Sequence, residues 1–122
     1  MKYLIMMYPN AEVLDALSEE ERNAVFQGHG GFMEKIKETG EFVGTLALAG
    51  TEQSSVVRVR GGVPAVTDGP YAEAKEYVGG VYIIEVKDQE RAHEIAAMIP
   101  DAAVEGLGIE VRPIVFSDGL AA

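Results

Sequence analysis

The sequence predicts a single α+β domain that spans residues 1–122. Two observations favour this class: short apolar strand patterns alternate with helical patterns, and no linker, repeat or low-complexity tract divides the chain. A length of 122 residues also lies in the usual range for one hydrophobic core. Because the chain contains no cysteine, disulfides and thiolate metal sites are excluded, and the fold must depend on packing.

The first strand and the first helix have clear signals. Residues 2–8 are apolar in both alternating sets, which is typical of a strand that is covered on both faces. Ser18 followed by Glu21 matches a capping box, so a helix is expected to begin there and to run to about Thr39. Gly40 follows, at the position where a left-handed helix stop favours glycine.

Five further strands and a second helix are expected after the first helix. The strand patterns occupy residues 42–48, 55–60, 63–67, 80–86 and 109–116. Gly61 and Gly62 provide the positive φ angles of a two-residue turn, which predicts a hairpin, and Pro64 makes its second strand an edge strand. Asp88 is placed to cap the second helix, and Pro100 ends it.

The order of these elements predicts a ferredoxin-like sandwich with an inserted β-hairpin. Two helices cover only one face of such a sheet, although the strands are apolar on both faces. A second copy of the chain, packed sheet against sheet, is the simplest cover, so we expect a homodimer. Glu110 and Arg112 lie on the same face of the last strand, and such a mixed surface suits the wall of a cavity.

The charge of the chain limits its partners. Ten Lys and Arg against twenty Asp and Glu give a formal charge of −10, which disfavours binding to a nucleic-acid backbone. The apolar run at residues 1–8 is too short to span a bilayer, and no small-residue cleavage site follows it. We therefore expect a cytoplasmic protein without nucleic-acid or membrane partners.

His29 is the most informative single residue. It lies between Val25 and Phe32 in the apolar stripe of the first helix, and Gly28, Gly30 and Gly31 surround it. Each glycine costs a helix interior about 1 kcal/mol relative to alanine, which indicates either a broken helix or the close approach of another group. His29 is thus a candidate acid/base residue, although a histidine on an apolar face is often a hydrogen-bonded core residue.

The stretch "TDGPYAEAKEYVGG" at residues 67–80 is longer and more polar than a simple turn requires. It resembles the signature of YCII-related proteins of the DGPF type, in which Asp-Gly-Pro-Phe-Ala-Glu-Thr-Lys-Glu precedes a glycine pair and a strand. The beginning of the chain at residues 1–4, the segment 57–60 and the end at residues 109–113 are similar to that family as well. Tyr71 replaces the phenylalanine of the pattern, and Ala74 replaces its threonine.

The resemblance implies a dimeric α/β barrel of ferredoxin-like subunits with a cleft. The wider YCII-related group carries a His–Asp pair in that cleft, and its histidine stands eleven residues before a helix-ending glycine, as His29 does before Gly40. The aspartate of the group precedes a proline after the second helix, where this chain has Ile99-Pro100 and places Asp101 on the far side. We therefore expect Asp68 of the Asp-Gly-Pro turn to be the partner of His29 instead.

The same loop supplies the remaining candidate site residues. With His29 and Asp68 as the catalytic pair, Tyr71, Lys75 and Arg112 are the expected substrate-binding residues. Glu73, Lys75 and Glu76 would lie at the mouth of the cleft, although such a charged run is also typical of a solvated loop.

Two functions follow from this reading. The first is a small-molecule enzyme, a cofactor-independent lyase, isomerase or hydrolase that uses His29 as general acid/base. The second is a non-catalytic module that binds a small ligand, associated with sigma-factor-type regulation as the resemblance implies. No glycine-rich dinucleotide or phosphate fingerprint is present, so no cofactor is expected, and two histidines without a thiolate predict no metal site.

Overall fold

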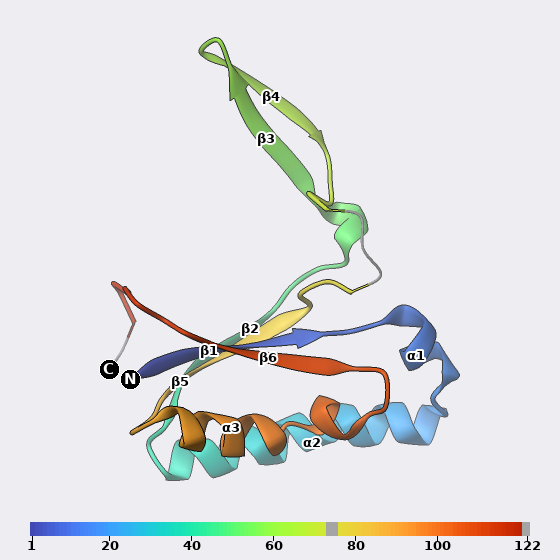
Figure 1. Cartoon of the computed structure of the whole chain (residues 1–122). Coiled ribbons are helices and arrows are strands. Elements are labelled where there is room, and N and C mark those ends of the chain that lie inside the picture. Colours follow the sequence, from blue (N-terminus) through green and yellow to red (C-terminus); the bar gives the residue numbers. More distant parts are fainter. Residues whose placement is uncertain (73–75, 121–122) are drawn as a thin grey trace.

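The computed structural model describes residues 1–72 and 76–120 (Figure 1). The strands are β1 (Lys2–Tyr8), β2 (Phe42–Ala47), β3 (Ser55–Arg60), β4 (Val63–Asp68), β5 (Gly80–Glu85) and β6 (Gly108–Pro113). The helices are α1 (Ala11–Ala16), α2 (Glu19–Glu38) and α3 (Gln89–Ala97), with short 3-10 helices η1 (Thr51–Gln53) and η2 (Pro100–Ala103). The chain is an α+β protein, as predicted.

Four strands form the main sheet, in the order β2-β5-β1-β6, and every neighbouring pair is antiparallel. This order is compatible with a ferredoxin-like fold. The register places Tyr3 of β1 opposite Ile84 of β5 on one side and Pro113 of β6 on the other. A bulge in β2 shifts its pairing with β5 between Phe42 and Gly44.

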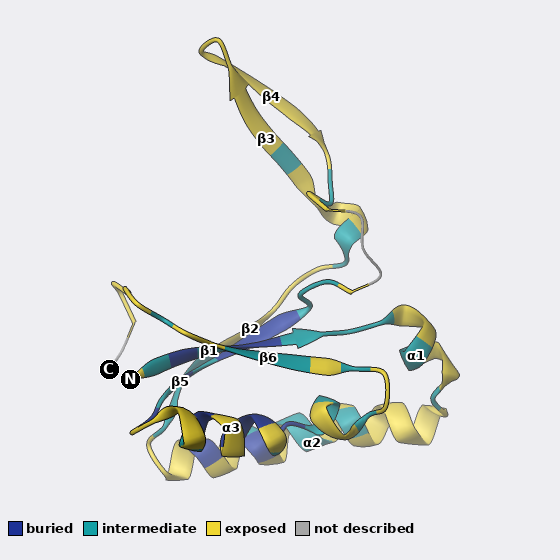
Figure 2. Cartoon of the chain, viewed as in Figure 1, coloured by how far each residue is buried: buried dark blue, intermediate teal, exposed yellow. Residues whose placement is uncertain are grey.

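The helices α2 and α3 cover one face of this sheet, and the hydrophobic core lies between the two layers (Figures 1 and 2). The core side chains are Tyr3, Ile5, Phe32, Ile36, Tyr82, Ile84, Val86, Ala92, Ile95, Ala96 and Ile99. Most of them come from the odd positions of β1, the even positions of β5 and one stripe of each helix, which is the pattern that strand and helix periodicity produce; Val86 and Ile99 follow just after β5 and α3. The chain therefore has one hydrophobic core, which lies between the main sheet and the layer of α2 and α3.

The boundaries of α2 agree with the prediction. The Ser18 hydroxyl accepts a hydrogen bond from the Glu21 N–H at 3.0 Å, and the Glu21 carboxylate accepts from the Ser18 N–H at 2.9 Å. Gly40 has a φ of 78°, a left-handed conformation that glycine adopts without strain. Helix α1 is not among the elements predicted from the sequence, and its N-terminus is capped by the Asn10 side chain.

The glycines of α2 do not break the helix. A Cβ atom at Gly28 would lie 2.7 Å from Cγ of Pro100, whereas a Cβ at Gly30 or Gly31 would meet nothing within 4 Å. Of the two interpretations of this glycine cluster, close approach is the correct one at Gly28, because η2 packs directly against the helix there.

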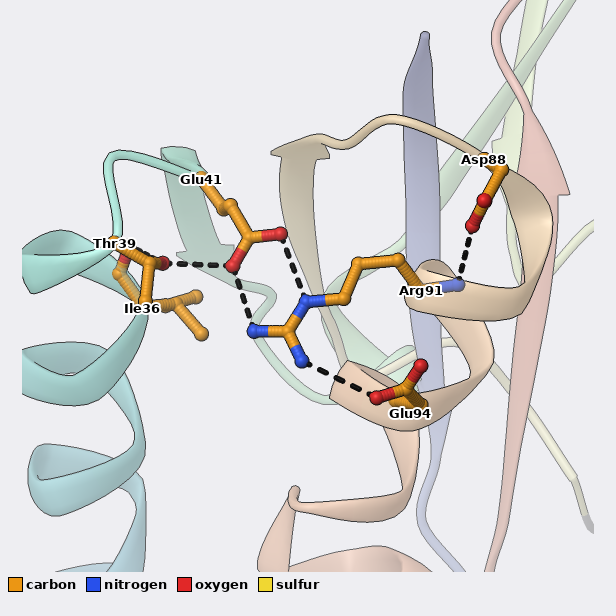
Figure 3. Close-up of polar contacts among 6 residues, drawn as sticks. All are labelled: Ile36, Thr39, Glu41, Asp88, Arg91 and Glu94. Carbon is orange, nitrogen blue, oxygen red and sulfur yellow. Dashed lines mark hydrogen bonds and ion pairs between the residues drawn. The ribbon is translucent and has the colours of Figure 1, made fainter.

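An ion-pair network holds the start of α3 beside the start of β2 (Figure 3). The Arg91 guanidinium donates from Nε and Nη2 to the two carboxylate oxygens of Glu41, at 2.9 and 2.8 Å, and from Nη1 to Glu94 at 3.4 Å. The Thr39 hydroxyl donates to the same Glu41 carboxylate at 2.7 Å. The hydrogen bonds from Arg91 lower the pKa of Glu41. The side chains of both residues are mostly shielded from solvent.

Strands β3 and β4 form a separate two-stranded sheet, which we call the hairpin. It projects away from the main sheet on the side opposite to α2 and α3 (Figure 1). Gly61 and Gly62 form its turn with φ angles of 56° and 79°, as expected from the sequence. Residues 63–68 are all exposed, in contrast to the central strands β1 and β5 of the main sheet (Figure 2).

The face of the main sheet opposite to the helices is apolar in the middle and polar at the β6 edge. Met6 and Val81 are buried there, while the Tyr8 hydroxyl donates to Glu110 at 2.9 Å and Arg112 Nε donates to the same carboxylate at 2.9 Å. We call this surface the outer face. The expected second copy of the chain would cover it, and that expectation stays a prediction.

The last strand is shorter than expected. It ends at Pro113, not at residue 116, because Pro113 pairs with Tyr3 and the partner strand β1 begins at Lys2. Val115 and Phe116 continue past the end of the ladder with exposed side chains. Within residues 1–72 and 76–120, no helix is both long enough and apolar enough to cross a membrane.

Candidate functional site

A cavity of about 630 Å³ opens between α2, the end of β2 and the start of β5. Most of its wall is apolar, and the residues that line it include Met7, Phe26, Met33 and Ala47. Gly30, Gly79 and Gly80 also line it, so backbone forms part of the surface. A volume of this size accommodates a small organic molecule.

Three polar side chains meet at the wall of this cavity: His29, Tyr82 and Asp101. The Nδ1 atom of His29 lies 2.6 Å from the Tyr82 hydroxyl, and its Nε2 atom lies 2.8 Å from a carboxylate oxygen of Asp101. His29 and Asp101 are largely shielded from solvent, with side-chain exposures of 22% and 14%. Both ring nitrogens therefore have a partner within the chain.

These partners assign the tautomer of a neutral His29 ring. A carboxylate oxygen only accepts hydrogen bonds, so Nε2 carries the proton and donates it to Asp101. Nδ1 is then the acceptor, and the Tyr82 hydroxyl donates to it. The result is a chain of hydrogen bonds from Tyr82 through His29 to Asp101.

Three separate elements bring this group together. His29 lies in the middle of α2, Tyr82 is the central buried residue of β5, and Asp101 belongs to η2 after α3. The close contact of Pro100 with Gly28 sets η2 against α2, one residue before His29. Gly28 thus allows the approach that carries Asp101 to the imidazole.

Tyr82 is fixed by its surroundings. Its ring makes an edge contact with Phe32 at a centroid distance of 4.9 Å and stacks on the His29 ring at 5.8 Å. Burial, together with the nearby negative charge of Asp101, raises the pKa of Tyr82 to about 12. The phenol therefore stays protonated at neutral pH and remains a hydrogen-bond donor to His29.

The structure corrects the expected partner of His29. We expected Asp68, but the ring contacts Asp101 instead, and Asp68 is an exposed residue at the end of β4 in the hairpin. The physical reason is the η2 turn: the chain bends back toward α2 directly after Ile99, so Asp101 reaches the ring from the far side of Pro100.

Of the other expected site residues, Tyr71 and Arg112 do not line this cavity. Tyr71 is exposed, with the Arg58 guanidinium 5.4 Å from its ring centroid. Arg112 lies on the outer face, paired with Glu110. Lys75 and Glu73 lie outside the described residues, and Glu76 is exposed. A substrate-binding role for Tyr71, Lys75 and Arg112 stays a prediction.

Sequence reasoning did not select Tyr82 or place Asp101 in the site. In the sequence, Tyr82 is one of several apolar residues of its strand. Its hydroxyl group is the feature that could have indicated a role in the site. Asp101 had a stronger signal, because it adjoins the position where the YCII-related group carries its aspartate. In the described part of the chain, no three His, Cys, Asp or Glu side chains gather closely enough to hold a metal ion.

Comparison with known proteins places the chain in a family. Residues 1–117 match the model of the YCII-related domain. The chain belongs to the YCII-related family. It is also 30% identical over 114 residues to an uncharacterized protein of Rhizobium meliloti (strain 1021), and this match covers 93% of the chain and 92% of the relative. The family assignment thus extends over nearly the whole chain and agrees with the predicted resemblance.

Proposed function

We propose that this YCII-related chain binds a small, largely apolar molecule in the cavity and that His29 moves a proton to or from it. The observation that carries the proposal is the joining of an imidazole, a carboxylate and a phenol at the wall of an otherwise apolar cavity. Cofactor-independent lyase, isomerase or hydrolase chemistry would use such a group.

The composition of the wall supports the class of ligand. Apolar side chains and glycine backbone make up most of the surface, and no lysine or arginine lines it in the described part of the chain. A ligand with several negative charges would have no fixed cation to bind there. The wall suits an apolar body that carries a single polar group, placed toward Tyr82, His29 and Asp101.

The hydrogen bonds suggest how His29 would act. Asp101 accepts the Nε2 proton and thereby holds the ring in one orientation, as the acidic member of a catalytic pair does. Nδ1 is left as the basic nitrogen, and the Tyr82 hydroxyl occupies it in the absence of ligand. A polar group of the ligand would either displace the Tyr82 hydroxyl from Nδ1 or exchange a proton with Nδ1 through that hydroxyl.

A second function has its own support. Both ring nitrogens already have partners within the chain, which is what a structural histidine in a binding wall also displays. A non-catalytic module would bind the same class of ligand without turnover. In that case the ligand would act as a signal, as an accessory role beside sigma-factor-type regulators would require.

We also propose that the protein is a homodimer in which the outer faces of two sheets meet. The outer face supports this arrangement, since the register places Leu46 beside Val81 on that face, and the Leu46 side chain is 49% exposed and would be covered by the second copy. Light scattering at low micromolar concentration is expected to give twice the chain mass of 13.1 kDa.

The test of the proposed function is a screen of small, mostly apolar compounds that carry one polar group, with binding followed by ligand-observed NMR and turnover by mass spectrometry. Gly30→Leu is expected to abolish binding, because Gly30 lines the cavity and a Cβ there has free space. Gly31→Leu is the matched control: its Cβ also has free space, but Gly31 does not line this cavity.

Turnover separates the two functions. His29→Gln and Asp101→Asn are expected to slow it at least tenfold while binding persists, and Asp68→Asn is expected to leave it unchanged. Equal turnover in wild type and His29→Gln would remove His29 from the mechanism. Binding without any turnover would support the ligand-binding module, and binding unaffected by Gly30→Leu would place the ligand elsewhere.

A further inference from the structure

The Tyr82 hydroxyl and Nδ1 of His29 place a hydrogen-bond donor beside a base. The two atoms are 2.6 Å apart, and both residues line the cavity. Because the proton of the neutral ring is on Nε2, Nδ1 has a free lone pair whenever the hydroxyl turns toward another acceptor. A ligand at this pair therefore meets an O–H donor and a basic nitrogen together.

Glycines leave space beside both groups. Gly30 follows His29 in α2, and a Cβ atom there would meet nothing within 4 Å. Gly80 stands two positions before Tyr82 in β5, so it lies on the same face of the strand. Both glycines line the cavity. The pair is thus bordered by backbone without side chains, which allows a ligand to approach it closely.

The remaining polar side chains of the wall do not offer the same combination. Among the described residues they are Gln27, Thr45 and Asp101. The Thr45 hydroxyl already donates to the Val81 carbonyl at 2.9 Å, and Asp101 accepts from the imidazole at 2.8 Å. Gln27 is an exposed residue of α2. A donor and a base therefore come together only at Tyr82 and His29 in the described wall.

The spacing of this pair matches a carbonyl group and the carbon beside it. With bond lengths of about 1.23 Å for C=O and about 1.52 Å for C–C, the oxygen of a ketone lies about 2.4 Å from its α-carbon. With the Tyr82 hydroxyl donating to the oxygen, Nδ1 of His29 would lie next to the α C–H. A carboxylic acid has a similar spacing, but its carboxylate at neutral pH would bring negative charge beside Asp101, and no lysine or arginine lines the described wall.

We propose that the cavity takes an apolar ketone whose α C–H is activated by an adjacent aromatic ring or double bond, and that Tyr82 and His29 together convert it to its enolate. This inference rests on the proposed function and names the substrate class and the reaction of the same site. The aromatic ring or double bond belongs to the apolar body that the wall favours, and the ketone is its single polar group.

The step is a proton transfer that consumes no other reactant. The α C–H bond breaks and its proton forms an N–H bond at Nδ1 of His29. The electron pair of that bond becomes the C=C bond of the enolate, and the carbonyl π pair moves onto oxygen, where the Tyr82 hydroxyl stabilises it. Asp101 stabilises the imidazolium through Nε2. Return of a proton to the α-carbon gives exchange, and return to the far end of an adjacent double bond gives an isomer.

Deuterium exchange tests the inference, with β-tetralone as the probe. This ketone has an apolar bicyclic body and a CH₂ group between its carbonyl and its aromatic ring. The full-length protein in D₂O at neutral pH is expected to speed deuterium incorporation at that carbon at least a hundredfold over buffer, as followed by proton NMR. His29→Gln and Tyr82→Phe are each expected to lower the protein-dependent rate about a hundredfold, while ligand-observed NMR still detects binding of β-tetralone.

His93→Gln is the matched control, because His93 is an exposed histidine of α3 that does not line the cavity, and its rate is expected to equal that of wild type. Circular dichroism checks that all variants keep the fold. Bound β-tetralone without protein-dependent exchange, or equal rates in wild type and Tyr82→Phe, would overturn the inference. Binding of β-naphthoate without binding of β-tetralone would overturn it as well.

These failures are distinct from a failure of the proposed function. If β-tetralone gives any of these results while another compound of the screen binds and loses binding in Gly30→Leu, the ketone is the wrong substrate class and the proposed ligand site stands. If no compound of the screen binds, the proposed function fails, and the assignment of a ketone fails with it.

Discussion

Strands β5 and β3 have the same length and a similar supply of β-branched side chains, yet the fold treats them in opposite ways. In β5 the side chains of Tyr82 and Ile84 are 2% and 0% exposed, whereas in β3 those of Val57 and Val59 are more than 60% exposed. Figure 2 displays the contrast: β1 and β5 in the middle of the main sheet are buried or half-buried, and nearly all of the hairpin is exposed. Strand-forming composition alone therefore does not create a core.

The difference lies in what each strand pair can contact. β5 has β1 and β2 as neighbours and two helices across one face, so its alternate side chains are removed from water. β3 has only β4, and its shape is set by the local Gly61-Gly62 turn. Three pairs of substitutions, each comparing a packed position with an open one, measure how far this contrast extends.

The largest effect is expected from the apolar side chains. Ile84→Ala should lower the free energy of unfolding by about 2–5 kcal/mol, because it leaves a cavity in a fully buried site. Val57→Ala should change it by no more than about 0.5 kcal/mol in the monomer, as other surface substitutions do. Urea denaturation at a concentration where light scattering gives one chain mass checks both values. A comparable loss in the two variants would mean that the hairpin is packed within its own chain.

The arginines give a second, smaller comparison. Arg91→Ala should cost about 1–2 kcal/mol, because it removes a bidentate pair from a Glu41 carboxylate that is mostly shielded from solvent. Arg58→Ala should cost less than about 0.5 kcal/mol, since its described contact is an exposed ring.

The cost of Arg91→Ala should also depend on pH. Arg91 lowers the pKa of Glu41 in the folded state. The contribution is thus complete above the ordinary glutamate pKa of about 4.3 and is lost as the pH falls through the lowered value. Denaturation at pH 7 and pH 3 tests this sign, and a constant difference between wild type and variant would contradict it.

The smallest effect concerns the glycines beside His29. Gly31→Ala should stabilise the protein by up to about 1 kcal/mol, because alanine favours a helix and its Cβ meets no other group. Gly28→Ala should instead be destabilising, because its Cβ would lie 2.7 Å from Pro100 and push η2 away from α2. The contact between Asp101 and His29 should weaken with it, as a change in the ¹⁵N shifts of the His29 ring. Equal stabilisation by both variants would remove the argument for close packing at η2.

The position of His29 could be predicted from local sequence patterns, whereas its hydrogen-bond partners could not. The placement of His29 in the core-facing stripe follows from helix periodicity, and the capping box and Gly40 define the helix that carries it. The partner of His29 could not be derived in this way, because the choice between Asp68 and Asp101 depends on how η2 packs on Gly28. Tyr82 was missed for the same reason: its hydroxyl has a role only where the rings of α2 and β5 meet.

The amino-acid sequence by itself determined the order of the main helices and strands, the hairpin turn and the α+β class, because periodicity, caps and glycine conformations act over a few residues. Only the tertiary structure decided which carboxylate meets the imidazole and which strands are buried. Those outcomes depend on contacts between residues far apart in the chain: His29 and Asp101 are 72 positions apart, and His29 and Tyr82 are 53 positions apart. Local preferences are the same for a buried and an exposed strand, and it is the packing of layers that distinguishes them.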